Sequence, residues 1–483
     1  MGKPTTSRRK SIAKRAAKRT ARRRSRVARR STRRGRLPRP EVRADDPTLT
    51  RFAGLIPLII YMTEQLRLPA VLKRVVGYRG RARVHAPHAV LFAFVVAVLA
   101  GVERLAHLDW LRDDIALVRY CRFAYWPVRK VFSNALAMVS DRGVEELERF
   151  VGELGLEPVR GAESAIVDID PTAIVDHGEA EGGMFGYCGK GRRRRRHFPL
   201  VASVAECRTV VMAKYRDGSN MTADEMLAFI EAAVTRVRAV LADGAVVFLR
   251  ADSEFWWPCI GRRLNELGFP FFMASPMNAG VKLMLHQATF KQLTDDEDIQ
   301  FASLDGRLTG HGEGVRIVVI RRRVHDPKAP PMGKVVPGFD KWRHQALVTN
   351  QVEWDPVDVW RFYNGRADCE RVFRVAKQTL ALSHLVGHRF RANEVAFLLR
   401  LLAFNADTRF QLHSEALAAA EQRPVRRLGL EWRQFRYFNS PGRLLRTARG
   451  YILRVPANQL LADVWAFYAP DLAAATAEEA ATA

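Results

Sequence analysis

The sequence predicts a mixed α/β fold that follows a helical N-terminal region. Apolar residues recur at three- and four-residue spacing between residues 46 and 160, which is typical of amphipathic helices. Short β-rich runs begin at residue 164 and are joined by glycine-rich or charged turns. From residue 222 onward, helical and strand patterns alternate, which describes a mixed sheet with flanking helices.

The first 45 residues form a strongly basic segment. Residues 1–40 hold 18 of the 78 lysines and arginines of the chain and no acidic residue. The segment lacks the apolar residues that offset the entropy of ordering, so we expect residues 1–45 to be a disordered tail until it contacts phosphates; a purely solubilising tail is the alternative. The rest of the chain still carries nine of the 27 net positive charges. This excess favours nucleic acid as the partner.

Residues 46–160 are expected to form a helical N-terminal domain. Its aromatic residues Trp110, Tyr120, Phe123 and Trp126 are interleaved with arginines. The mixture is typical of a domain that grips a DNA backbone. An aromatic core with solvated arginines is an equal alternative, because no helix-turn-helix motif is present.

Two features argue against a membrane-bound or secreted protein. The apolar run at residues 89–102 is shorter than the roughly 20 residues of a membrane span, and Glu103 and Arg104 follow it directly. It predicts a buried helix. The five cysteines are scattered and form no Cys-x-x-Cys pair, which excludes a typical structural zinc site and favours a reducing cytoplasm.

Residues 161–278 are predicted to be the first part of the α/β domain. The predicted strands are residues 164–170, 173–177, 197–206, 209–216, 245–252 and 270–275, and the predicted helices are residues 222–242 and 255–268. The strands before residue 217 follow one another closely, so we expect them to form an antiparallel ladder.

Residues 279–342 are predicted to be a β-rich insertion. They contain the strand pattern at 314–324 and the proline-rich stretch at 328–338. The second part of the α/β domain, residues 343–411, resumes with a strand at 344–350 and continues with helices at 356–382 and 392–411. Residues 412–483 are expected to be a helical C-terminal region.

Two aspartates stand at the carboxyl ends of predicted strands. Asp170 and Asp252 each follow an apolar run, so the backbone would hold each carboxylate rigidly at the mouth of the sheet. Side chains alternate along a strand, so Asp168 shares a face with Asp170 and is an alternative to it. Each aspartate also has a structural interpretation: Asp170 as a turn residue before Pro171, and Asp252 as a helix N-cap.

A third group lies in the predicted helix at 356–382 and comprises Tyr363, Arg366, Glu370 and Lys377. In a continuous helix, offsets of three, seven and fourteen residues bring the four side chains onto one stripe, within roughly 60°. One acid between two cations, beside an apolar face, is not expected of a plain solvated surface. The alternatives are an i,i+4 salt bridge between Arg366 and Glu370 and a helix break at Gly365.

Three carboxylates on separate elements suit metal-assisted phosphoryl transfer. Two Mg²⁺ ions about 3.5–4 Å apart activate a water or a 3′-hydroxyl and stabilise the leaving oxygen. Mg²⁺ prefers oxygen ligands and keeps several waters, so a few carboxylates suffice. Arg366 and Lys377 would then hold non-scissile phosphates.

Residues from about 164 to 411 resemble the DDE transposases of bacterial insertion sequences. Tyr363-x2-Arg366-x3-Glu370-x6-Lys377 matches the Tyr-(2)-Arg-(3)-Glu-(6)-Lys signature of the cut-and-paste group. The segments DIDPT, HGEAEGG, GRRRRRHFPL, LRADSEF and FRANEVAFLLRLLAFN look like the insertion-sequence thirteen-eighty type. Cys188 departs from this pattern, in which an asparagine is expected.

The resemblance implies an RNase H-like catalytic fold with a β-rich insertion before the glutamate. In such a fold Asp170, Asp252 and Glu370 are the catalytic triad and bind two Mg²⁺ ions, for which Mn²⁺ substitutes. Tyr363, Arg366 and Lys377 are expected to contact the transposon end. The resemblance also implies a homodimer in a synaptic complex with terminal inverted repeats and target DNA, a hairpin DNA intermediate, and a nucleoid-associated location in the bacterial cytoplasm.

Five consecutive arginines precede a predicted strand and are expected to line the DNA channel: Arg192, Arg193, Arg194, Arg195 and Arg196. A solvated turn is the alternative. Like charges in such a run repel one another unless an anion lies close, which favours phosphate contact.

The leading hypothesis is therefore a DNA transposase that cuts and joins the terminal inverted repeats of an insertion sequence. A non-catalytic, transposase-derived DNA-binding or architectural protein is the main alternative, and a generic nuclease is a third. Retention of all three acids favours catalysis.

Overall fold

The computed structural model describes residues 41, 43–77, 84–188, 192–305, 314–324, 336, 338, 341–448, 450–456 and 459–470. Side chains of residues 305, 368–373 and 459–461 also lie outside this description. The chain divides into two units, Met1–Pro47 and Thr48–Ala483. Most of the predicted tail at 1–45 and most of the proline-rich stretch at 328–338 fall outside the described residues.

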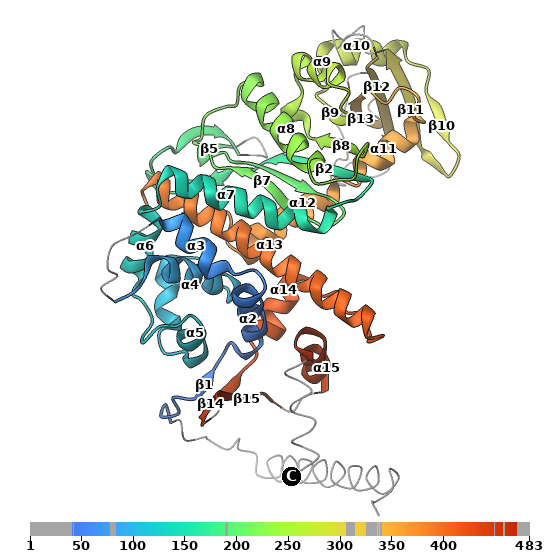
Figure 1. Ribbon diagram of the computed structural model, residues 1–483. Helices are drawn as coiled ribbons and strands as arrows, with labels where there is room; N and C mark the ends of the chain where they lie inside the picture. Colours follow the sequence, from blue (N-terminus) through green and yellow to red (C-terminus); the bar gives the residue numbers. More distant parts are fainter. Residues whose placement is uncertain are drawn as a thin grey trace, which may run out of the picture. The chain divides into compact units, whose positions relative to one another are not determined.

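A large mixed sheet forms the centre of the α/β part (Figure 1). Within the described residues its nine strands follow the order β10-β11-β12-β13-β9-β8-β2-β6-β7. β8 pairs in parallel with both β2 and β9, and the other neighbours are antiparallel. The predicted mixed α/β fold is confirmed and is consistent with an RNase H-like domain. The strands are β2 Ser164–Pro171, β6 Leu200–Val204, β7 Thr209–Lys214, β8 Val246–Ala251, β9 Phe271–Ser275, β10 Lys291–Leu293, β11 Asp296–Asp305, β12 Arg316–Arg323 and β13 Trp342–Thr349.

The two faces of β2 have different environments. Ala165, Val167 and Ile169 are fully buried in one hydrophobic core. This core is completed by α8 (Ala223–Arg238), which packs against β2 and β8. Because side chains alternate along a strand, Asp168 and Asp170 lie together on the opposite face. The sheet therefore separates an apolar side from a side that carries carboxylates.

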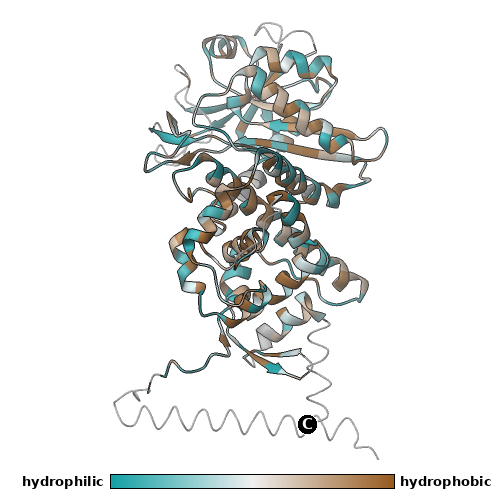
Figure 2. Cartoon of the chain, turned by 60° about the vertical axis from the view of Figure 1, so that its left-hand side comes forward, coloured by the Kyte–Doolittle hydropathy of each residue, from teal (hydrophilic) through white to brown (hydrophobic). Residues whose placement is uncertain are grey.

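Helices cover the sheet on both faces. α7 (Asp141–Leu156) and the long helix α13 (Phe390–Ala420) pack against β7, and α7 also contacts β6. α9 (Pro258–Glu266) follows β8 and packs against α8, and α10 (Ala279–Gln287) follows β9. Hydrophobic residues run along helices and strands throughout and are interrupted by hydrophilic ones (Figure 2).

The segment before β2 is helical and shares one core with α13. α4 is buried along almost its whole length, so the apolar run at 89–102 is a core helix as predicted. Among the described residues no single helix is long and apolar enough to span a membrane; α2 and α3 meet that criterion only jointly, across a 63° bend. The elements are η1 Ala53–Leu55, α2 Ile56–Glu64, α3 Leu68–Val76, α4 Pro87–Leu99, η2 Leu105–Leu111, α5 Ile115–Tyr120, α6 Arg129–Ala137 and η3 Glu157–Val159.

The strands of the predicted insertion at 279–342 belong to the central sheet. β10, β11 and β12 continue it beyond β13 through antiparallel pairing. Ile299 is buried. The apolar run at 317–320, on the strand between β11 and β13, is buried throughout. The segment thus extends the sheet at the edge formed by β13.

The C-terminal region differs from the predicted helical region at 412–483. After α14 (Leu430–Trp432) and a π-helical turn, η6 (Arg433–Phe438), the chain forms a hairpin of β14 (Gly442–Thr447) and β15 (Gly450–Arg454). β14 also pairs with β1 (Leu49–Thr50), and α15 (Gln459–Tyr468) follows. A proline at position 441 cannot continue a helix, and pairing with β1 gives the next residues a strand partner.

A separate three-stranded sheet lies between β2 and β6 in the sequence. Its strands are β3 (Ile174–Val175), β4 (Met184–Tyr187) and β5 (Arg193–His197), in the order β3-β5-β4. Both pairings are antiparallel. β5 therefore carries four of the five consecutive arginines and is labelled near one end of the large sheet in Figure 1.

Candidate active site

The two strand-end aspartates lie at the same edge of the sheet. β2 and β8 are parallel neighbours, and their last paired residues are Ile169 and Ala251. Asp170 and Asp252 each follow directly after this pair. The sequence prediction that both carboxylates stand at the carboxyl ends of strands agrees with this geometry.

Asp252 also caps the short helix that follows it. Its carboxylate accepts a hydrogen bond of 2.8 Å from the backbone N–H of Glu254, at the start of η4 (Ser253–Phe255). The capping interpretation is therefore correct. It does not remove Asp252 from the site, because its negative charge is close enough to raise the pKa of Asp170.

Two cations at the start and near the end of α12 (Ala367–Thr379) lie close to Asp170. Arg366 is 5% exposed and donates from Nη2 to Oδ1 of Asp170. Lys377, which is half-buried in α12, is also close enough to Asp170 for a favourable charge interaction. The structure thus brings together Asp170, Asp252, Arg366 and Lys377, four residues from three separate segments.

The electrostatics of this cluster keep Asp170 partly protonated. Burial raises the pKa of Asp170 from 3.8 to about 6. Arg366 and Lys377 oppose this shift, whereas the charge of Asp252 adds to it. Burial also lowers the pKa of Lys377, and Asp170 counteracts that effect. Each of these two carboxylates disfavours the charged form of the other, and a cation bound between them would favour the charged form of both.

Glu370 lies in α12, four residues after Arg366 and seven before Lys377. Its side chain is outside the described residues. The assignment of Glu370 as the third carboxylate therefore stays a prediction.

The predicted helix at 356–382 is two helices. α11 (Pro356–Asn364) ends at Gly365, and α12 starts after Arg366. A Cβ on Gly365 would lie 2.6 Å from Nη1 of Arg250, so the close approach of this arginine requires glycine there. The single straight stripe of four residues is thus wrong, and the alternative of a break at Gly365 is right.

Tyr363 lies on the far side of this break, within α11. It is 7% exposed and packs in an apolar cluster with Phe272, Leu347 and Val359. The expected contact of Tyr363 with the transposon end stays a prediction.

Asp168 has a structural role. It is fully buried, and both of its carboxylate oxygens accept hydrogen bonds of 2.7 Å from Nε and Nη2 of Arg250. The remaining nitrogen, Nη1, donates to the backbone carbonyl of Phe362 at 2.8 Å. One ion pair therefore ties β2, β8 and α11 together. Because Asp168 is held in this pair, Asp170 is the better candidate for a metal ligand.

The five consecutive arginines divide into two groups. Arg192, Arg193 and Arg194 are exposed. Arg195 is half-buried and contacts Asp176 at 3.5 Å, and Arg196 is 2% exposed. The predicted DNA contact therefore suits the first three, whereas the last two hold the small sheet together.

Glu254 is a further acid that sequence reasoning did not single out. Burial raises its pKa to about 7, with added repulsion from Asp252 and Asp170 and a favourable contribution from Arg196. It thus lies within electrostatic reach of both aspartates, although its side chain is partly exposed. Its position two residues after Asp252 was the sequence feature that could have identified it as a neighbour of the site.

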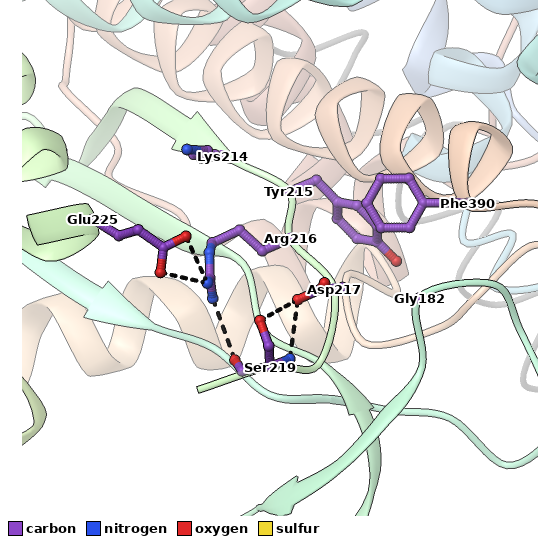
Figure 3. Close-up of a pocket in the computed structure, with 8 residues that line it drawn as sticks. All are labelled: Gly182, Lys214, Tyr215, Arg216, Asp217, Ser219, Glu225 and Phe390. Carbon is purple, nitrogen blue, oxygen red and sulfur yellow. Dashed lines mark hydrogen bonds and ion pairs between the residues drawn. The ribbon is translucent and has the colours of Figure 1, made fainter. Parts of the chain in front are cut away.

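A pocket of about 480 Å³ lies elsewhere, at the end of β7 (Figure 3). Arg216 and Glu225 form an ion pair of 3.1 Å in its wall, and the rings of Tyr215 and Phe390 face each other 5.1 Å apart. None of the residues that line this pocket is a candidate carboxylate of the site above. We therefore assign the chemistry to the strand ends and not to this pocket.

The donor set at the strand ends suits a hard divalent cation. Among residues with described side chains, no cluster of three His, Cys, Asp or Glu residues forms a cation site. The described donors are the oxygens of Asp170 and Asp252. Mg²⁺ is typically bound through one or two carboxylates plus water and substrate phosphate, so this pair fits it.

Comparison with known proteins gives three findings. A family model described as transposase DDE domain group 1 matches residues 39–475. No curated protein matches the chain. Among solved structures, the chain is similar to one titled as a piggyBac transposase synaptic complex with hairpin DNA, with 10% sequence identity, a TM-score of 0.46, and coverage of 80% of this chain and 79% of that chain.

Proposed function

Because the chain belongs to the transposase DDE domain group 1 family, we propose that it cuts and joins DNA at the terminal inverted repeats of an insertion sequence. The reaction is cut-and-paste transposition with metal-dependent phosphoryl transfer. The observation that carries this proposal is the placement of Asp170 and Asp252 at adjacent parallel strand ends, with Arg366 and Lys377 facing them.

Asp170, Asp252 and Glu370 would hold two divalent ions, Mg²⁺ or in its place Mn²⁺. When bound, these ions supply an activated oxygen nucleophile and stabilise the leaving oxygen during in-line displacement. The raised pKa of Asp170 supports this assignment, because a bound cation favours the charged form of both aspartates.

The protein's own residues orient the site and hold the phosphates. The buried guanidinium of Arg366 donates a hydrogen bond to the carboxylate of Asp170 and would help to position it. Lys377 adds a second positive charge beside the same carboxylate. Both are suited to hold non-scissile phosphates, arginine through paired donors and lysine as a point charge.

The partners follow from the same family resemblance. We propose that the enzyme binds transposon ends and target DNA as a homodimer in a synaptic complex. Its insertion sequence would be of the thirteen-eighty type, and its setting the bacterial cytoplasm at the nucleoid. The exposed arginines Arg192, Arg193 and Arg194 support binding to the DNA backbone.

A cleavage assay tests the proposal. Purified full-length protein is incubated with Mg²⁺ and labelled DNA that carries the inverted repeats flanking its gene. We expect nicks at the repeat termini and joined products with wild type. Asp170→Ala, Asp252→Ala and Glu370→Ala should bind the same DNA without cutting it. Binding by wild type without any nick or joined product would favour the architectural alternative.

A further inference from the structure

The small sheet carries an exposed aromatic surface that the proposed function does not use. In β4, Phe185 is 70% exposed and Tyr187 is 50% exposed. Alternation along the strand puts both rings on one face. The β4–β5 register places Arg193 opposite Tyr187 and Arg195 opposite Phe185, on that same face. We call Phe185, Tyr187 and Arg193 the hairpin face.

The other side of this hairpin is held firmly. Arg196 donates to the backbone carbonyl of Tyr187 and, at 3.3 Å, to Oδ1 of Asn220. Its guanidinium lies over the ring of Phe198, 3.7 Å from the centroid. A Cβ on Gly218 would lie 1.9 Å from the carbonyl oxygen of Arg196, so the loop after β7 packs directly against β5. The hairpin that exposes Phe185 and Tyr187 is therefore well packed on its other side.

The base of the hairpin is held at a second place. Glu181 accepts a hydrogen bond of 2.9 Å from the backbone N–H of Phe390 at the start of α13. The backbone N–H of Gly218 donates to the carbonyl of Gly182 at 2.8 Å. Figure 3 shows Gly182 and Phe390 close to the loop that carries Asp217 and Ser219.

The anchored side of the hairpin borders the carboxylate site. Arg196 is close enough to Glu254 for a favourable charge interaction, and Glu254 follows Asp252 by two residues. A DNA strand that reaches Asp170 and Asp252 therefore passes near the hairpin.

The charge of the surface identifies its occupant. Arg193 is exposed and forms no ion pair with any residue that the structure describes, and Arg195, on the same face, is half-buried beside Asp176. A second copy of this chain docked symmetrically on the same face would bring like charges together. A polyanion with flat rings meets both features at once: phosphates for the arginines and bases for the aromatic rings.

We propose that the hairpin face binds DNA with unpaired bases. Phe185 and Tyr187 stack on the bases, and Arg193 contacts the backbone. In a closed duplex the base faces are stacked on one another, so the surface distinguishes opened from fully paired DNA ends. This inference rests on the proposed function, and it adds a specificity that the carboxylate site does not provide.

Metal-free binding measurements test the inference on the full-length protein. The probes are a blunt duplex of random sequence and the same duplex with a short oligothymidine tail that contains 2-aminopurine. Wild type should bind the tailed probe more tightly and quench its fluorescence through stacking. Phe185→Ala and Tyr187→Ala should each weaken tailed binding by about tenfold, leave blunt binding unchanged and abolish much of the quenching. Arg193→Ala should weaken binding to both probes and lower the salt dependence.

Matched variants separate stacking from general effects. Phe435 is 71% exposed within η6, so Phe435→Ala removes an equally exposed ring and should leave both probes unaffected. Phe185→Trp should preserve the tail preference, whereas Phe185→Leu should lose it while keeping an apolar side chain.

Three results would overturn the inference. The first is an unchanged tail preference in the double variant of Phe185 and Tyr187. The second is an equal loss on blunt and tailed probes in each aromatic variant. The third is loss of self-association in these variants without DNA, measured by sedimentation, which would assign the face to a second copy. A protein that shows the stacking signature and still never cuts terminal repeats would refute the proposed function alone.

Discussion

Two carboxylates on one face of β2, two residues apart, lie in different environments. Asp168 is fully buried, and Arg250 holds both of its oxygens at 2.7 Å. Asp170 contacts Arg366 through one oxygen and shares its surroundings with Asp252. In the Asp168–Arg250 pair both carboxylate oxygens accept hydrogen bonds. In the Asp170–Arg366 pair the pKa of the carboxylate is raised to about 6. An acid's neighbours, and not its residue type, decide whether it stabilises the fold or performs chemistry.

The position along the strand explains the difference. Asp168 is paired across the sheet with residues of both β6 and β8, and its partner on β8 is Arg250 itself. Asp170 lies just beyond the last β2–β8 pair. Depth in the sheet thus gives Asp168 a buried partner on the neighbouring strand, whereas the strand end leaves the side chain of Asp170 18% exposed and near Asp252.

The largest expected effect concerns activity. Asp170→Asn should lower the rate of DNA cleavage on the order of 10³-fold or more, because a neutral amide no longer supports a divalent ion at the site. DNA binding should persist, and the free energy of unfolding should not fall. Single-turnover cleavage and urea unfolding measure the two quantities. A variant that cuts at the wild-type rate would remove Asp170 from the site.

The next effect concerns stability. Arg250→Met leaves the carboxylate of Asp168 buried without its partner, and the free energy of unfolding should fall by about 3–5 kcal/mol. The double variant Asp168→Leu with Arg250→Met should recover most of this loss, since both charges are then absent. Equilibrium unfolding in urea provides the test. A single variant as stable as wild type would contradict the role assigned to the pair.

The third effect is the pH dependence of stability. In metal-free protein, the pKa of Asp170 is about 6 in the fold against an ordinary value of 3.8 for an aspartate. Between these pH values the folded state retains a proton that the unfolded chain has released, so stability falls as pH rises. Relative to Asp170→Asn, wild type should lose about 2 kcal/mol between pH 4 and pH 6. Thermal or urea unfolding in the presence of a chelator measures the difference, and equal pH profiles would refute it.

The smallest effect concerns the helix break. Gly365→Ala places a methyl group 2.6 Å from Nη1 of Arg250, and the overpacking should cost about 1–3 kcal/mol. A Cβ on Gly387 meets no atom within 4 Å, so Gly387→Ala is the matched control and should have little effect. If both variants unfold at the same urea concentration, the contact between Gly365 and Arg250 does not constrain the site.

Local patterns in the sequence were sufficient for much of the fold. Alternating apolar residues predicted β2 and β8 nearly to their ends, and the long apolar run predicted the buried helix α4. These patterns succeed because burial and periodicity act within one element. The hairpin of β14 and β15 was missed because its partner strand β1 lies almost 400 residues earlier in the chain.

The same division applies to the candidate site. The residue types and spacing of Asp170, Asp252, Arg366 and Lys377 were readable in the sequence, because strand ends and helical offsets are local properties. Three features could not be read from the sequence: the choice between Asp168 and Asp170, the break at Gly365 and the nearness of Glu254 to both aspartates. Each depends on Arg250 or on neighbouring charges, which long-range contacts bring into place.

The sequence by itself determined many of the elements, the basic character and the acids available for chemistry, since these depend on composition and short-range periodicity. Only the tertiary structure decided which acid is closed by an arginine and which remains at the sheet edge. The physical reason is that hydrogen bonds, burial and Coulomb interactions act between residues close in space, whatever their separation along the chain.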